Sequence, residues 1–310
     1  VPLIKHELIR GYVVYAGAGG VMVLAAALLV MWLTNGAQAM AFYQETEWVN
    51  YLMIAGELFL TGLIVYLSIK YRKYPVILLS VGQTALGIWT EFRFPMQPAC
   101  HMQIDSLSML MCMIAAFIGG LICIYAVGYM KAYHQHHKEF QDRSGFFFSM
   151  LFLFLAAMFG LVLSENLIWM YFFWEITSLS SFWLIGFTRT KEATNNAFRA
   201  LIMNLLGGLS FAVGIVILGT VFGTIELDTM LMVGSVYGEI VAIPAAFFAF
   251  AGITKAAQMP FNSWLLGAMV APTPTSALLH SSTMVKAGVF MIIKLSPVLG
   301  MGNFAGIMTM

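Results

Sequence analysis

The sequence predicts an all-α, polytopic membrane protein, and three observations support that fold class. Of the 310 residues, 61% are hydrophobic and only 9% are charged, whereas a soluble domain carries about 25% charged residues. Apolar segments of membrane-spanning length, ~20 residues, recur along the whole chain. Basic residues gather in every second connecting segment, which is the pattern of a chain that crosses a membrane repeatedly.

The amino-terminal region, residues 1–103, is expected to contribute three membrane helices and a connector. These helices cover residues 11–33, 48–69 and 75–91. The first two are long apolar runs. The third is short and contains Gln83, so its apolar character is the weakest of the three.

A fourth helix, residues 104–130, and a cytoplasmic loop form a second region, residues 104–145. The third region, residues 146–296, is expected to hold five helices. They cover residues 146–163, 166–188, 197–222, 238–271 and 275–296. Pro260 breaks the fourth of these five, because proline lacks a backbone donor. Residues 297–310 are expected to start a further helix.

The placement of positive charge predicts the orientation of the chain. Connecting segments on one side of the membrane hold 11 of the 15 basic residues. They are Lys5, Arg10, Lys70, Arg72, Lys73, Lys131, Lys138, Arg143, Arg189, Lys191 and Arg199. Because basic loops stay in the cytoplasm, we expect a multi-pass protein of the inner (cytoplasmic) cell membrane with a cytoplasmic amino terminus. The histidines of the segment 131–143 are interpreted as part of a solvated connector rather than as a metal site.

The composition predicts no cofactor and no metal in this chain. Its three cysteines, Cys100, Cys112 and Cys123, form no C-x-x-C pair, so they supply neither a zinc nor an iron–sulfur ligand set. The sequence also lacks a glycine-rich phosphate loop and a basic patch for nucleic acid. Any redox chemistry must therefore lie on partner chains.

Lys255 stands in an otherwise apolar stretch, five residues before Pro260. A lysine at mid-membrane is unfavourable by about 2.5–3.5 kcal/mol, and it persists only where it faces protein or water. A broken helix at membrane depth is tolerated only where it lines a cavity or packs in protein. We therefore expect Lys255 and Pro260 to form the centre of a buried ion path. The alternative is a lysine near a helix end that snorkels to the surface.

Glu175 lies near the middle of the predicted helix 166–188, and Ser178 shares its helical face. A carboxylate at that depth must be paired, hydrated or protonated. Its natural partner is Lys255, because a neighbouring carboxylate and burial act in opposite directions on a lysine's affinity for a proton. Moving the two groups together or apart would then drive proton uptake and release. The alternative is a static buried ion pair that fixes packing.

The predicted helix 275–296 carries His280 and Lys286, which are six residues apart and do not share a face. We expect them to be successive stations for protons, with Thr283 helping to hold water. The alternative for His280 is a core histidine whose hydrogen bonds are satisfied.

Three other polar residues in the predicted helices are weaker candidates. Glu57 lies at mid-membrane but has no visible partner. Asn204 and the glycine pair Gly207-Gly208 fit close packing of helices. Lys294 is expected to snorkel from the outer end of its helix.

Two long motifs and one short one carry a family resemblance. Residues 254–290 are T-K-A-A-Q-M-P-F-N-S-W-L-L-G-A-M-V-A-P-T-P-T-S-A-L-L-H-S-S-T-M-V-K-A-G-V-F. Residues 165–187 are E-N-L-I-W-M-Y-F-F-W-E-I-T-S-L-S-S-F-W-L-I-G-F, and residues 103–108 are Q-I-D-S-L-S. Over about residues 100–300, the chain resembles the antiporter-like membrane subunits shared by complex I, Mrp-type cation/proton antiporters and energy-converting hydrogenases.

This resemblance implies a fold of two inverted repeats of five helices, each with one broken helix. Residues 146–296 would be the first repeat, and the second is missing from this chain. The chain begins at Val1 and stops inside an apolar run, so we expect its true termini to lie elsewhere.

The resemblance also implies roles for individual residues. Glu175 corresponds to the family's helix glutamate and Lys255 to the lysine of its broken helix. His280 and Lys286 fall on the helix that continues the proton path.

The chain has one helix more before the first repeat than the usual family member. Together with the motif N-N-A-F-R-A-L-I-M-N-L-L-G-G-L, residues 195–209, this extra helix looks most like the large membrane subunit of Ech-type NiFe hydrogenases. That implies a proton- or Na⁺-translocating subunit coupled to electron transfer on partner subunits. The partners would be other membrane subunits and peripheral subunits that hold iron–sulfur clusters and a NiFe centre.

Three other hypotheses stay open. The first is a Mrp-type cation/proton antiporter subunit driven by an ion gradient. The second is a scaffold with a vestigial ion path, and the third is an inorganic-carbon uptake subunit paired with a zinc-bearing partner.

Overall fold

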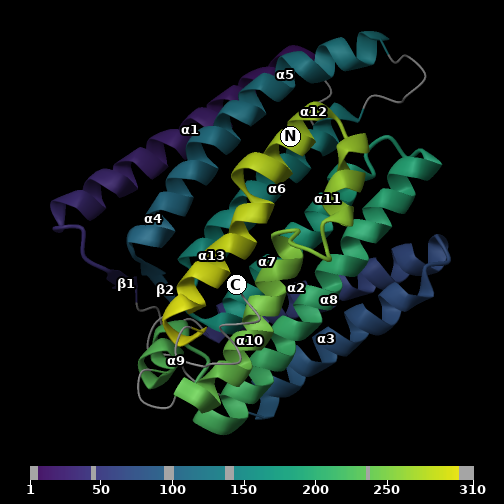
Figure 1. Ribbon diagram of the computed structural model, residues 1–310. Helices are drawn as coiled ribbons and strands as arrows, with labels where there is room; N and C mark the ends of the chain where they lie inside the picture. Colours follow the sequence, from purple (N-terminus) through teal and green to yellow (C-terminus); the bar gives the residue numbers. More distant parts are fainter. Residues whose placement is uncertain (1–5, 43–46, 94–100, 137–142, 235–237, 300–310) are drawn as a thin grey trace.

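The computed structural model of the chain is a bundle of α-helices with one short β-sheet at one end (Figure 1). It describes residues 6–42, 47–93, 101–136, 143–234 and 238–299. Six helical segments in this described part are long and apolar enough to cross a membrane. The chain is therefore an all-helical polytopic membrane protein, as the sequence predicts.

The amino-terminal part of the described chain holds three long helices. They are α1 (Glu7–Thr34), α2 (Glu47–Lys70) and α3 (Tyr74–Arg93). α3 packs against α2 and against the long helix α8 (Lys191–Phe222). Its buried residues are Val76, Ser80, Gln83, Thr84 and Thr90. Four of these five are polar, so α3 turns a polar face into the bundle, and this explains its weak apolar character.

The middle of the chain is helical from α4 to α8, apart from short connecting segments. Its helices are α4 (Ser106–Met113), a π-helical segment (Ile114–Ile118), α5 (Gly119–His136), α6 (Ser144–Leu163), α7 (Leu167–Ile185) and α8. The segments from α4 to α5 follow one another without a break and correspond to the predicted fourth helix. α8 begins at residue 191 rather than 197, because the Thr190 hydroxyl caps it by accepting a 3.1 Å hydrogen bond from the Ala193 N–H.

The last described part contains two interrupted helices. Its elements are α10 (Gly238–Lys255), α11 (Ser263–Gly267), a 3₁₀ turn (Ala268–Val270), α12 (Thr273–Ala277), a π-helical segment (Leu278–Ser282) and α13 (Met284–Leu299). The predicted helix 238–271 therefore ends at Lys255 and resumes at Ser263. Residues 300–310, where a further helix is expected, lie outside the described residues.

Three short elements at one end of the bundle were not expected from the sequence. β1 (Met40–Phe42) pairs antiparallel with β2 (Met102–Ile104), and α9 (Leu227–Gly234) lies at the same end (Figure 1). The Glu165 N–H donates a 2.9 Å hydrogen bond to the His101 carbonyl, so the loop before α7 is attached to the segment before α4. We call this end of the molecule the sheet end.

The helices differ in how deeply they are buried. At the centre, α8 packs against both α7 and α10, α13 packs against α10, and α6 packs against α7. α1 lies along α5 on one flank, and α2 and α3 lie on another (Figure 1). Only 17% of the most apolar stretch of α1 and of α2 is buried. Apolar faces of that extent suit lipid or a neighbouring membrane chain.

Candidate functional site

The break in the predicted eighth helix begins directly after Lys255. The N–H groups of Ala257 and Gln258 donate to carbonyls of the last turn of α10, at 3.2 and 3.1 Å. Ala257 has a φ of 54°, the left-handed conformation that this kind of helix end requires. Pro260 lies within the break but does not start it, which corrects the sequence-based prediction.

A buried tryptophan stabilises this helix end. Trp264 of α11 is fully buried, and its indole N–H donates a 3.0 Å hydrogen bond to the carbonyl of Thr254. Carbonyls in the last turn of a helix lack intrahelical donors. Trp264 supplies a donor to one of them inside the bundle.

The ammonium group of Lys255 is enclosed by α7. The side chain is 0% exposed, which excludes a snorkelling lysine. Its Nζ donates to the backbone carbonyl of Trp174 at 2.8 Å and to the hydroxyl oxygen of Ser178 at 3.3 Å. It also lies 4.1 Å from the centre of the Trp174 ring, in a cation–π contact. Three electron-rich groups of one helix therefore surround the lysine nitrogen.

Glu175 follows Trp174 on α7, and its carboxylate contacts α3. The residue is 4% exposed, and its Oε2 accepts a 2.7 Å hydrogen bond from the amide of Gln83. Its Oε1 is buried and has no hydrogen-bond partner. Glu175 and Lys255 form no direct ion pair, so their expected pairing is indirect and runs through the α7 backbone.

The glycine pair of α8 allows this close assembly, as the sequence predicts. A Cβ atom on Gly207 would overlap the side chain of Thr254. A Cβ on Gly208 would lie 2.5 Å from Glu175 Oε1 and 2.8 Å from Gln83 Oε1. Side chains at these positions would displace either the end of α10 or the carboxylate.

His280 lies in the π-helical segment Leu278–Ser282, and its buried Nε2 atom has no hydrogen-bond partner. Single π-helical turns are frequent at functional sites. The Thr283 hydroxyl, expected to hold water, instead donates to the Leu278 carbonyl at 2.6 Å. The role of His280 in proton transfer stays a prediction.

Lys286 is half-buried near the start of α13. No hydrogen bond or ion pair joins it to another described residue. α13 crosses α10 in very close contact, since a Cβ on Gly288 would overlap the backbone of Gly252 and Ala256. The helix that carries Lys286 therefore packs directly on the break that follows Lys255, while a role for Lys286 itself stays a prediction.

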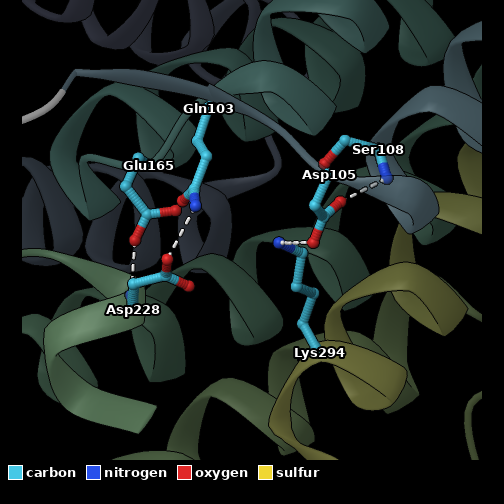
Figure 2. Close-up of polar contacts among 6 residues, drawn as sticks. All are labelled: Gln103, Asp105, Ser108, Glu165, Asp228 and Lys294. Atoms are coloured by element: carbon cyan, nitrogen blue, oxygen red, sulfur yellow. Dashed lines mark hydrogen bonds and ion pairs between the residues drawn. The ribbon is translucent and has the colours of Figure 1, made fainter. Parts of the chain in front are cut away.

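A second group of charged residues occupies the sheet end (Figure 2). Lys294 of α13 forms a 2.6 Å ion pair with Asp105, and its side chain is only 9% exposed, which corrects the expectation that Lys294 snorkels. Asp105 also accepts a 2.7 Å hydrogen bond from the Ser108 N–H and so caps α4. Burial alone would raise the pKa of Asp105, but its bonds to Lys294 and Ser108 hold it below the usual value.

Glu165 lies beside this pair, in the loop between α6 and α7 (Figure 2). Its carboxylate accepts a hydrogen bond from the backbone N–H of Asp228, whose own carboxylate accepts a 2.7 Å bond from Gln103. Burial raises the pKa of Glu165 to about 8, and the nearby carboxylates of Asp228 and Glu226 add to that effect.

Sequence reasoning missed several residues that build both groups. In the sequence, Gln83 only weakens the apolar character of its helix, and Trp174 and Trp264 only belong to the two long motifs. A glutamine facing a membrane interior was the signal for Gln83, because buried amides need partners. Gln103, Asp105 and Ser108 of the sheet-end group stand in the short motif 103–108, but no local pattern joins them to Glu165, Asp228 and Lys294, which come from three other segments.

A buried lysine beside a helix break, together with a buried glutamate, is typical of membrane proteins that translocate ions. Ionisable residues inside membrane helices mark ion or proton paths. Two family models match the chain. "NADH:quinone oxidoreductase/Mrp antiporter, TM" covers residues 164–310, and "NADH-Ubiquinone oxidoreductase (complex I), chain 5 N-terminus" covers residues 89–140. The chain belongs to the antiporter-like membrane subunits of complex I and Mrp antiporters.

Named relatives within this family are antiporter subunits. A putative antiporter subunit mnhA2 of Staphylococcus haemolyticus (strain JCSC1435) is 37% identical over 238 residues, which are 72% of this chain and 29% of the relative. A Na⁺/H⁺ antiporter subunit A1 of Staphylococcus aureus (strain Newman) is 41% identical over 203 residues, which are 63% of this chain and 24% of the relative. The chain thus spans about a quarter of the length of these relatives.

Two solved structures share the fold. The membrane-bound sulfane sulfur reductase, an archaeal respiratory membrane complex, matches with a TM-score of 0.60 and 18% identity, over 84% of this chain and 55% of the other. The Mrp complex from Dietzia sp. DQ12-45-1b matches with a TM-score of 0.53 and 26% identity, over 79% of this chain and 28% of the other. The first similarity concerns the fold alone.

Proposed function

We propose that the chain is part of an ion-translocating subunit of a Mrp-type Na⁺/H⁺ antiporter, driven by an existing ion gradient, with other membrane subunits as partners. The named relatives support this proposal, because those at 37% and 41% identity are antiporter subunits. They favour this alternative over the hydrogenase hypothesis drawn from the motifs.

The observation that carries the proposal is the enclosure of Lys255. Its ammonium is fully buried yet is held by a carbonyl, a hydroxyl and a ring rather than by a carboxylate. A charge held only by neutral groups in a low dielectric is sensitive to small displacements. A shift of α7 relative to α10 would therefore change the protonation of Lys255.

Glu175 is the group that would couple Lys255 to its surroundings. Trp174 and Ser178, the two contacts of Lys255, flank Glu175 on the same helix. A change of charge on Glu175 would alter both the field at the lysine and the position of its acceptors. In this proposal, His280 and Lys286 continue the path beyond the break.

The test is Na⁺/H⁺ antiport by the complete complex in inverted membrane vesicles from a host without its own antiporters. We expect Lys255→Met to abolish Na⁺-driven proton movement while the complex still assembles. Lys191→Met is the matched control, because Lys191 is exposed at the start of α8. Wild-type antiport in the Lys255→Met complex would refute the role of this lysine.

The redox-driven hypothesis is the second candidate function. Its support is the fold similarity to a respiratory membrane complex over 84% of the chain, which does not extend to the reaction. Under this hypothesis, peripheral subunits with iron–sulfur clusters and a NiFe centre copurify, and ion movement requires an electron donor. Antiport by a complex without such subunits would exclude it.

The proposed orientation places the amino terminus in the cytoplasm of a cell whose inner membrane holds the protein. It predicts that the sheet end faces outward. In a chain whose three native cysteines are replaced by serine, a membrane-impermeant thiol reagent added to whole cells should label Gln38→Cys, beyond the end of α1, but not Lys191→Cys. The reverse pattern would invert the orientation.

A further inference from the structure

Glu57 of α2 is a buried carboxylate outside the five-helix unit, and the sequence shows no partner for it. The residue is 7% exposed, and its Oε1 atom has no hydrogen-bond partner. The Thr84 hydroxyl of α3, which shares a 2.6 Å hydrogen bond with Thr61 of α2, lies beside its carboxylate. No basic side chain in the described part of the chain pairs with it. A carboxylate so placed within a membrane helix is retained as a neutral acid or as part of a proton path.

α3 brings Glu57 close to Glu175. Gln83 is 1% exposed and donates to Glu175, whereas its own Oε1 is buried without a partner. Four residues further along the same face of α3, a Cβ on Gly87 would lie 3.1 Å from Glu57 Oε1. The two carboxylates therefore contact successive turns of one helix.

A tyrosine hydroxyl lies near both acids. Tyr171 precedes Glu175 by one turn of α7, is 1% exposed, and its hydroxyl has no hydrogen-bond partner. It lies within electrostatic range of both Glu175 and Glu57. A phenol can donate one hydrogen bond and accept another at the same time, so it can connect two carboxyl groups.

We propose that Glu57 is a second proton-holding carboxylate, which exchanges a proton with Glu175 through the hydroxyl of Tyr171. The inference rests on the proposed ion-translocating function. It extends the proposed proton path from Glu175 on α7 to Glu57 on α2, beside α3. In the exchange, the O–H bond of protonated Glu175 breaks as the Tyr171 oxygen takes the proton. The original hydroxyl proton of Tyr171 passes to Glu57, and the tyrosine ends neutral.

Unpaired oxygens of the described residues argue for this arrangement over static packing. Glu57, Gln83 and Glu175 each leave one buried oxygen without a donor. Three acceptors in one region need at least one shared proton, because buried polar groups in native proteins are satisfied. A proton that moves between the acids satisfies different members of the group in turn.

The transport test uses the complete complex and isosteric variants. We expect Glu57→Gln and Tyr171→Phe each to slow antiport by about tenfold, since proton relays contribute at least that much to a rate, and to change the pH profile. Glu57→Asp should recover part of the activity. Glu192→Gln is the matched control, because Glu192 is exposed at the start of α8. Wild-type rates and pH profiles in Glu57→Gln would overturn the inference.

A second measurement separates this inference from the proposed function. Infrared difference spectra of the purified complex, recorded as the pH is changed, report the carbonyl stretch of protonated carboxyl groups without any transport. We expect one such band to disappear in Glu57→Gln and to shift in Glu175→Gln, since the two acids share a proton. A Glu57 band unaffected by Glu175→Gln would refute the exchange, even if Lys255→Met abolishes antiport. If the band disappears in Glu57→Gln and shifts in Glu175→Gln, but Lys255→Met retains normal antiport, only the proposed role of the lysine is refuted.

Discussion

The Nζ atom of Lys255 donates a 2.8 Å hydrogen bond to the backbone carbonyl of Trp174, the residue directly before Glu175 on α7. The lysine is thus bound to the helix that carries the acid, and not to the acid itself. A carbonyl cannot move without its helix, so we expect Lys255 to respond to the position of α7 as well as to the charge on Glu175. Coupling of this kind transmits a displacement through the bundle and does not require the two charges to meet.

Ser178 supplies the second acceptor for the ammonium, at 3.3 Å. We expect Ser178→Ala to slow antiport by about tenfold, because a hydrogen bond to a charged group contributes about 1.5–3 kcal/mol. Ser180→Ala is the control, since the Ser180 hydroxyl donates to the Ile176 carbonyl of the same helix at 2.7 Å and does not touch the lysine. Equal effects of the two substitutions, measured in inverted vesicles, would show that helix packing and not the ammonium contact matters.

Gly208 of α8 lies directly against the carboxylate of Glu175. An added methyl would meet Glu175 Oε1 at 2.5 Å and Gln83 Oε1 at 2.8 Å. We expect Gly208→Ala to destabilise the protein by about 1–3 kcal/mol, as overpacking does, and to reduce antiport at least as strongly as loss of Gln83. Gly82→Ala is the control, because nothing lies within 4 Å of the Cβ that it adds. A normal melting temperature and rate for Gly208→Ala would mean that the carboxylate moves away freely.

Much of the fold follows from the sequence because a membrane restricts the choices. Spans of ~20 apolar residues and the placement of basic loops located α1, α2, α3 and the helices up to α8, although the predicted ends of α5 and α8 differ from the structure by about six residues. The broken helix was also expected, from Lys255 and Pro260. Its end at Lys255, with Ala257 in the left-handed conformation, was not expected, because alanine rarely adopts the conformation that glycine favours at helix ends.

The site was predicted only as far as single residues allow. Lys255 and Glu175 were identified because a charge within an apolar run is visible in one segment. The bond from Gln83 to Glu175 joins residues 92 positions apart, and no local pattern encodes such a contact. The same holds for Lys294, which was expected to snorkel because its partner Asp105 lies in a distant part of the chain.

The ion pair of Asp105 and Lys294 is expected to stabilise the sheet end. Breaking a buried pair costs about 3–5 kcal/mol, but Asp105 is 30% exposed, so we expect about 1–2 kcal/mol for Asp105→Asn. Asparagine caps a helix as well as aspartate does, so the change isolates the ion pair. Thermal unfolding of the purified complex measures it, with Glu7→Gln as control for the exposed pair of Glu7 and Lys131 at 3.9 Å.

The pH dependence of this pair has a defined sign. The folded-state pKa of Asp105 is lowered from its usual 3.8, so the stabilisation is present at neutral pH and is lost as the pH falls through the lowered pKa. We expect the melting temperature of Asp105→Asn to lack the part of the acid-induced decrease that protonation of Asp105 causes. A wild-type acid response in Asp105→Asn would assign it to another carboxylate.

Glu165 should have the opposite pH dependence. Its folded-state pKa is raised from 4.5 to about 8, chiefly by burial. The folded protein therefore holds a proton that the unfolded chain has released, and its contribution to stability is complete below pH 4.5 and is lost as the pH rises through about 8. We expect the melting temperature of the wild-type complex to fall as the pH is raised from 4.5 to about 8. The melting temperature of Glu165→Gln should fall less.

The neighbours of Glu165 decide how this experiment is read. His101, whose pKa burial lowers, carries no charge that changes across the upper part of that range. Asp228 and Glu226 are the other acids near Glu165, and Lys294 is the nearest cation. A matched Glu226→Gln variant should keep the fall in melting temperature, because Glu165 would still lose its proton inside the sheet end. If Glu226→Gln flattens the curve and Glu165→Gln does not, the assignment to Glu165 is wrong, and its contact with the Asp228 N–H is then a fixed link between the loop before α7 and the start of α9.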